Sequence, residues 1–388
     1  MPDTIHAVVA QRVGEPADVL RLESRPRPKP GAGQVLVRVR AAPVHATDMH
    51  IMRGRYGYTP EFPTVLGSES VGVVEAVGTG VDTVEVGQRV VTVFVTGTWQ
   101  ELVVVPSSQV VPVPDDLSDS AACQLVINPL TALLLLREIG VQPDEWLLQT
   151  AAGSTVGKLV VQLAHHLGIP TINVVRRRAV VHEILQLGGT EAICTEDEDL
   201  AARVGEIVGD DGVRNALDCV AGQLGADVFR ALAPEGELLV YGALSTHRQT
   251  DPSALTIPLF ARSIIYDAKK VRGFWLFRWV VTTPPEVTAA TPHRGRNLVT
   301  DGILEIPAGQ PIAVERFADA VSLAETPPTA PSPSSSSTVR PRRRRQAPRT
   351  RVGNGHAATS PQPVEYRGPP VRGTETSATV GWVRNAQR

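Results

Sequence analysis

The sequence predicts a mixed α/β protein in which a β-rich domain precedes a doubly wound parallel sheet. Two observations predict this class. Short, alternating, β-branched segments separated by Pro and Gly turns fill residues 1–128, and strand-like segments alternate with helical ones from residue 129 onward. Hydrophobic residues make up 42% of the 388 residues and charged residues 20%, so the chain can bury the cores of two or three domains.

Residues 1–128 are expected to form a barrel-like β domain because the strand candidates follow one another closely. Turns such as Pro30-Gly31-Ala32-Gly33 and Val86-Gly87-Gln88 separate them. The candidates are His6–Gln11, Gln34–Ala41, Ser70–Val77, Arg89–Val95 and Gln100–Val105.

Residues 129–268 have the rhythm of βαβ units, which favours a parallel sheet. A buried strand over Trp146–Ala152 is followed by a helix over Thr155–Leu167 that carries its apolar residues on one side. The further strands expected are Thr171–Val175, Ala192–Thr195, Ala216–Val220 and Glu237–Gly242, with helices over Val180–Leu187 and Leu224–Leu232.

Residues 269–326 are expected to return to the first domain without completing it, and residues 327–388 to form a disordered basic tail. After Thr326 the chain carries eleven Arg, no Lys and two Glu, without apolar periodicity. Such a segment buries too little apolar area to offset its ordering entropy. An arm that binds nucleic acid or membrane is one interpretation. The favoured interpretation is a tail without function, of the kind that a shifted reading frame in GC-rich DNA produces. Neither nucleic acid nor membrane is therefore expected as a partner.

Several absences indicate a cytoplasmic protein. The three cysteines (Cys123, Cys194 and Cys219) form no C-x-x-C pair, which fits a reducing compartment and argues against a structural zinc cluster. No run of eighteen apolar residues predicts a membrane span, and the first residues lack the charged and apolar regions of a secretory signal.

A cofactor loop is predicted at QTAAGSTVG, residues 149–157, between a strand and a helix. A Rossmann unit places the pyrophosphate of a dinucleotide there, against the helix N-terminus. Gly153 and Gly157 allow close approach of the backbone, and Ser154 and Thr155, followed by Val156, can donate hydrogen bonds or cap the helix. The alternative is a strand–helix turn with packing glycines, because the pattern is not a strict G-x-G-x-x-G.

The end of the second strand indicates which dinucleotide binds. It reads Val174-Val175 followed by Arg176, Arg177 and Arg178. An NAD site has an acidic residue here for the ribose 2′-hydroxyl, whereas Arg accommodates the 2′-phosphate of NADP. Three arginines without an acid therefore favour NADPH, the alternative being a solvated basic start of the helix.

Further segments resemble the medium-chain dehydrogenase/reductase superfamily, and within it the zinc-independent, mitochondrial-type trans-2-enoyl-CoA/acyl-carrier-protein reductases. The resemblance is carried by APVHATD (42–48), LGSESVGVV (66–74), VGQRV (86–90), GRYGYTPEFP (54–63), VINPLTA (126–132), TINVVRRR (171–178), YGAL (241–244) and VRGFWL (271–276). It implies a GroES-like catalytic domain before the Rossmann domain, a homodimer, and NADPH-dependent reduction of enoyl thioesters in fatty acid metabolism.

The resemblance also implies roles for single residues. Tyr56 matches the catalytic tyrosine, which polarises the thioester carbonyl and helps to protonate the α-carbon, whereas Tyr58 has no such match. Asn128 and Thr131 border the nicotinamide, and the arginines match the 2′-phosphate site. The far wall around the nicotinamide and the acyl group is implied for Tyr241, Gly242, Ala243, Leu244, Phe274, Trp275 and Leu276.

Zinc is not expected. Where zinc members of the superfamily have a Cys, a His and a third ligand, this chain has His45, Ser68 and Asn128, and one ligand cannot make a three-ligand site. Two other functions stay open: an NADPH:quinone or enone oxidoreductase, which needs no catalytic tyrosine, and an inactive relative that acts as a binding protein. Acyl length and the choice between CoA and acyl carrier protein are open as well.

Overall fold

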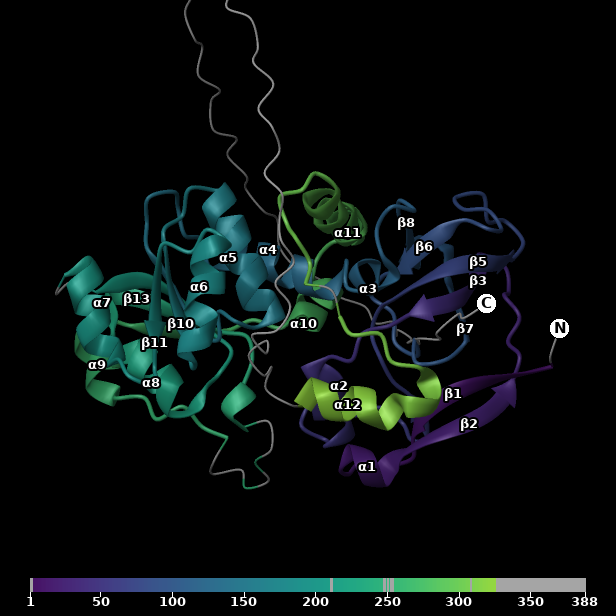
Figure 1. Ribbon diagram of the computed structural model, residues 1–388, viewed down its shortest axis with the longest axis horizontal. Helices are drawn as coiled ribbons and strands as arrows, with labels where there is room; N and C mark the ends of the chain where they lie inside the picture. The colour runs from purple at the N-terminus through teal and green to yellow at the C-terminus, as the bar shows by residue number, and fades with distance from the viewer. Residues whose placement is uncertain are drawn as a thin grey trace, which may run out of the picture. The chain divides into compact units, whose positions relative to one another are not determined.

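The computed structural model describes residues 3–325, apart from 210–211, 247–248, 250, 252–254 and 308 (Figure 1). The tail predicted for residues 327–388 therefore lies outside the described residues. Within the described part of the chain, no helix is both long and apolar enough to cross a membrane.

The first domain contains two antiparallel sheets, with strand orders β2-β1-β4 and β7-β3-β5-β6-β8. The valine-rich inner faces of both sheets pack into one core. Its elements are β1 (Thr4–Ala10), α1 (Pro16–Val19), β2 (Leu20–Pro26), β3 (Gln34–Ala41), α2 (Ala46–Met52), β4 (Thr64–Val65), β5 (Ser70–Val77), β6 (Arg89–Thr92), β7 (Leu102–Pro106), β8 (Val110–Pro112) and α3 (Asp119–Ala122).

The second domain contains a parallel six-stranded sheet in the order β11-β10-β9-β12-β13-β14. Counted along the chain this is 3-2-1-4-5-6, so the strand order reverses between β9 and β12, where dinucleotides bind in sheets of this topology. Its elements are α4 (Ile127–Ile139), β9 (Leu147–Gln149), α5 (Thr155–His166), β10 (Thr171–Val175), α6 (Arg178–Gln186), β11 (Glu191–Cys194), α7 (Leu200–Val208), β12 (Val213–Asp218), α8 (Gly222–Arg230), β13 (Leu232–Val240) and β14 (Lys270–Gly273).

The remaining helices are α9 (Ala261–Tyr266), α10 (Leu276–Thr282), α11 (Pro285–Thr300) and α12 (Phe317–Glu325). Strand β14 extends the parallel sheet beyond residue 268. Helix α12 then contacts the first domain: Val321 lies in its core, and Glu325 pairs with Arg53 at 2.6 Å. Figure 1 shows α12, in yellow-green, beside α1 and α2.

The predicted fold class is confirmed, and the strands Gln34–Ala41, Ser70–Val77 and Thr171–Val175 have the predicted bounds. The sequence pattern did not reveal α4. Most of its residues are buried, including Leu134, Leu135 and Leu136 in succession. A helix buried on nearly all sides lacks the one-sided apolar stripe that makes a helix visible in a sequence.

Candidate functional site

The predicted cofactor loop joins β9 to α5, beside the point where the strand order reverses. Ser154 is the N-cap of α5, and its hydroxyl accepts a hydrogen bond from the Gly157 amide at 3.1 Å. A Cβ atom at Gly157 would lie 2.6 Å from the carbonyl oxygen of Ala151, so only glycine lets the helix start this close to the strand. The amides of this helix end and its positive dipole fit a dinucleotide pyrophosphate.

A buried carboxylate that the sequence did not single out lies at the same end of the parallel sheet. Asp218, at the end of β12, is fully buried and accepts a hydrogen bond from the Thr150 hydroxyl at 2.6 Å. It also accepts from the amides of Val220 and Ala221, both at 2.9 Å. Asp218 therefore holds together the loops that leave β9 and β12. The isolated sequence offered no sign of it beyond an acid at the end of a strand.

The three arginines at the end of β10 are not equivalent. Arg178 is exposed and donates to Asp197 from its Nε at 3.1 Å, and it also pairs with Glu198 at 3.1 Å. Arg176 and Arg177 form no ion pair with another described residue. The structure thus leaves these two cations available for an anion beside the cofactor loop, whereas Arg178 is partly neutralised by its acidic neighbours.

Tyr56 lies in the loop that follows α2, and its hydroxyl accepts a hydrogen bond from the indole N–H of Trp275 at 2.7 Å. The two rings meet edge to face with their centroids 5.3 Å apart. Burial raises the pKa of the Tyr56 phenol, and its hydrogen bonds with Trp275 and Thr47 oppose this rise. The structure therefore brings together two predicted site residues that are 219 positions apart in the chain.

Two further aromatic side chains complete this cluster. Tyr58 packs against Tyr56 at 5.3 Å between centroids, and Phe277 packs against both Tyr58 and Trp275. Burial raises the pKa of Tyr58 to about 12. Gly57 lies directly under the indole: a Cβ atom there would approach Trp275 Cη2 to 2.7 Å. The sequence analysis did not identify Phe277, although it directly follows the matched VRGFWL segment.

Asn128 and Thr131 lie in the first turns of α4. Asn128 is 8% exposed, and the Thr131 hydroxyl donates to the carbonyl oxygen of Ile127 at 2.7 Å. Helix α4 packs against α5, which starts at the cofactor loop. Their positions are compatible with the predicted place beside the nicotinamide.

The segments predicted as the far wall follow β13 and β14. The Tyr241 amide donates to the carbonyl oxygen of Asp218 and the Phe274 amide to that of Val240, both at 2.8 Å. Both rings pack against the hydrophobic core. Burial raises the pKa of the Tyr241 phenol well above its usual value, with Cys219 as its neighbour. The structure thus places the main chain of these segments beside the ends of β12 and β13, and Trp275 contributes the side chain that reaches Tyr56.

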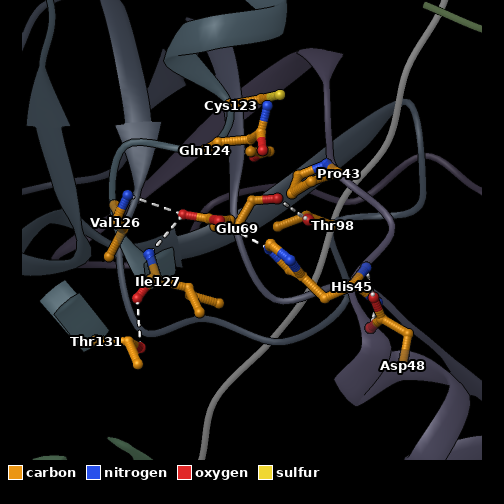
Figure 2. Close-up of polar contacts among 12 residues, drawn as sticks. Pro43, His45, Asp48, Glu69, Thr98, Cys123, Gln124, Val126, Ile127 and Thr131 are labelled. Carbon is orange, nitrogen blue, oxygen red and sulfur yellow. Dashed lines mark hydrogen bonds and ion pairs between the residues drawn. The ribbon is translucent and has the colours of Figure 1, made fainter. Parts of the chain in front are cut away.

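The residues at the positions of the zinc ligands in zinc-dependent members do not fit a zinc site. The Nε2 atom of His45 is hydrogen-bonded to Glu69 Oε1 at 2.8 Å (Figure 2). Asn128 and the Ser68 hydroxyl supply neutral oxygens, which are not the ligands that zinc takes in proteins. Among the described residues, no three His, Cys, Asp or Glu side chains form a group that could hold a metal ion.

Comparisons with known proteins agree with this architecture. The alcohol dehydrogenase GroES-like domain family matches residues 31–115, and the zinc-binding dehydrogenase family matches residues 155–291. The mitochondrial enoyl-[acyl-carrier-protein] reductase of Rattus norvegicus is 31% identical over 332 residues, which cover 84% of this chain and 87% of the rat protein.

Solved structures show the same fold. A quinone oxidoreductase of Pseudomonas syringae has a TM-score of 0.74 and 26% identity over 84% of this chain and 98% of its own. The Escherichia coli quinone oxidoreductase complexed with NADPH has a TM-score of 0.73 and 23% identity over 82% and 96%. The 2-enoyl thioester reductase heterodimer of Candida tropicalis has a TM-score of 0.72 and 22% identity over 83% and 97%.

Proposed function

The chain belongs to the medium-chain dehydrogenase/reductase superfamily, and from this premise we propose that it reduces the 2,3 double bond of trans-2-enoyl thioesters with NADPH. The observation that carries the proposal is the hydrogen bond between Trp275 and Tyr56. An indole N–H can only donate, so the phenol oxygen accepts from it and the phenol proton stays available to an acceptor other than Trp275. A thioester carbonyl oxygen is such an acceptor.

The chemistry follows from a phenol that donates its proton to the substrate carbonyl. NADPH, when bound, supplies the hydride that adds to the β-carbon of the substrate. Negative charge then develops on the thioester oxygen, where a positioned phenol stabilises it through a hydrogen bond without a metal. The edge-to-face contact with Trp275 and the packing of Tyr58 hold the Tyr56 ring in one orientation. A fixed donor loses little free energy to reorganisation when the charge forms.

The cofactor assignment is supported by the loop and by the arginines. Ser154 and the amides at the start of α5 suit the pyrophosphate. Arg176 and Arg177 stand where the ribose 2′-phosphate of NADPH would lie, at the end of the second strand of the unit.

A second candidate is the reduction of quinones or other enones by the same cofactor. The similarity to the Pseudomonas syringae quinone oxidoreductase favours it, because that protein has the same fold over nearly its whole length. A quinone already carries two conjugated carbonyl groups and is reduced without a protein acid at the carbonyl. The two candidates therefore differ in their need for Tyr56.

The experiment that tests the function measures NADPH consumption with crotonyl-CoA and with a quinone, for the wild type and two variants. Tyr56→Phe removes one hydroxyl and little volume, and we expect enoyl turnover to fall about a hundredfold with unchanged NADPH binding. Tyr58→Phe removes a hydroxyl from the neighbouring ring and should be close to neutral.

The other outcomes are equally informative. If Tyr56→Phe reduces the enoyl thioester at the wild-type rate, the tyrosine serves only in packing. Quinone reduction that neither variant alters, without enoyl reduction, would favour the second candidate. NADPH binding without turnover of either acceptor would indicate an inactive relative.

The open edge of the parallel sheet is the proposed homodimer contact. Strand β14 is exposed along its whole length and pairs through one side only, with β13, among the described strands. The nearby Ile265 and Tyr266 of α9 are 67% and 75% exposed. An unpaired edge beside exposed apolar side chains suits pairing with a second copy. Sedimentation of a monomer at micromolar concentration would contradict this assembly.

A further inference from the structure

Glu69 is a fully buried carboxylate that joins the first domain to the start of α4. Its Oε1 atom is 2.8 Å from His45 Nε2, and its Oε2 atom accepts hydrogen bonds from the amides of Val126 and Ile127, both at 2.9 Å. Figure 2 shows Glu69 at the centre of these contacts, with His45 on one side and the two amides on the other.

The partners of Glu69 belong to the two helices that carry the proposed site. His45 is the N-cap of α2, which leads into the loop with Tyr56. Val126 and Ile127 begin α4, which carries Asn128 and Thr131. A carboxylate bonded to the first amides of α4 also interacts favourably with its dipole. The Glu69 side chain therefore joins α2, which precedes the proposed proton donor Tyr56, to α4, which carries the residues proposed to border the nicotinamide.

Glu69 and His45 are themselves held in place. The Thr98 hydroxyl donates to the main-chain oxygen of Glu69 at 2.6 Å. The amide of His45 donates to Asp48 Oδ2 at 2.8 Å, and Asp48 Oδ1 accepts from the Gly67 amide at 3.1 Å. Directional hydrogen bonds therefore hold both Glu69 and His45 in place. Apolar packing alone would let the two segments shift relative to each other.

We propose that Glu69 is a positioning residue for hydride transfer: its bonds to His45 and to the α4 amides set the distance between the Tyr56 loop and the start of α4, beside which the nicotinamide would bind. The idea rests on the proposed NADPH reductase function but not on the identity of the acceptor. Reacting groups that are misplaced by about 1 Å can cost two orders of magnitude in rate.

The test compares Glu69→Ala and Glu69→Gln with the wild type. Kinetics are measured with NADPH and with NADPH deuterated at the transferred position. We expect Glu69→Ala to lower kcat about ten- to a hundredfold and to increase the deuterium isotope effect, because hydride transfer becomes slower than the other steps. The KM for NADPH should change less than about threefold. Glu69→Gln should lower kcat less than Glu69→Ala, since its amide oxygen still accepts from α4 while its NH2 group replaces the oxygen that faces His45.

Glu75→Ala is the matched control. Glu75 lies in β5, the strand that begins directly after Glu69, and is also largely buried, but its partners are Arg27 and Arg38. It should leave the isotope effect unchanged even where it lowers stability. An unchanged kcat in Glu69→Ala, or a loss without a larger isotope effect, would overturn the proposal.

If Glu69→Ala does not fold, Glu69→Asp decides in its place, because its carboxylate is one methylene short of the α4 amides. A lower kcat with a larger isotope effect supports the proposal, and wild-type values overturn it. The assays use whichever acceptor the wild type reduces, so a failure with enoyl thioesters that spares quinones refutes the proposed function alone. A wild type that reduces neither acceptor overturns both.

Discussion

The cofactor loop and the tyrosine loop are both glycine-containing turns, but they are assembled in different ways. The cofactor loop is held by neighbours in the sequence. The Ser154 hydroxyl accepts from the amide of Gly157, three residues later, and the Gln149 side chain donates to the carbonyl oxygen of Gly157 at 3.1 Å. The Tyr56 loop is held by Trp275, from beyond the parallel sheet. A site built within one segment leaves a pattern in the sequence, and a site built across domains does not.

The first way to sharpen this comparison is on the cofactor side, where we expect the largest effect. Replacing Arg176 and Arg177 together by Ala should raise the KM for NADPH about ten- to a hundredfold, because hydrogen bonds between charged groups are lost. The KM for NADH, which has no 2′-phosphate, should change less than about twofold. Steady-state kinetics with both cofactors measure the difference.

Arg178→Ala is the control for that double variant. Its side chain already pairs with Asp197 and Glu198, so its removal should affect NADPH less than the loss of the other two arginines. Equal increases in KM for NADPH and NADH in the double variant would contradict the assignment of the 2′-phosphate site.

The next prediction tests whether Trp275, which is distant in the sequence, holds the Tyr56 loop in place. Gly57→Ala places a methyl group within 2.7 Å of Trp275, so the indole must move away from the Tyr56 hydroxyl. We expect kcat for the enoyl thioester to fall about tenfold through the lost hydrogen bond and the freed ring, with unchanged NADPH binding. Stopped-flow rates of hydride transfer measure the effect.

Gly205→Ala serves as its control, because an added methyl group in α7 meets no atom within 4 Å and alanine favours a helix. This variant should be as active as the wild type and no less stable. If Gly57→Ala is equally active, the indole does not hold the tyrosine in a position that matters.

The sequence therefore predicted the parallel sheet and the glycine loop from periodicity and spacing, and these are local properties. Tyr56 and Trp275 were predicted only through the family resemblance, since nothing in their own spacing relates them. Glu69 and Asp218 escaped the sequence analysis because a single acid carries no sign of the amides that will surround it. Their partners become neighbours only when separate loops meet.

The smallest expected effect concerns Asp48, the buried carboxyl that supports His45. Burial raises its pKa to about 6, against 3.8 in the unfolded chain, while His45 and the amides of His45 and Gly67 oppose the rise. Between these two pH values the folded protein retains a proton that the unfolded chain has lost, so the stability contributed by Asp48 is present at low pH and is lost as the pH rises through about 6.

The variant Asp48→Asn tests this dependence, because its side chain stays neutral throughout. Chemical unfolding at several pH values should show the free energy of unfolding of the variant gaining about 2 kcal/mol on the wild type between pH ~4 and ~7. A constant difference for Asp48→Asn would mean that the carboxyl is ionised equally in both states, and that the support of His45 carries no cost in stability at neutral pH.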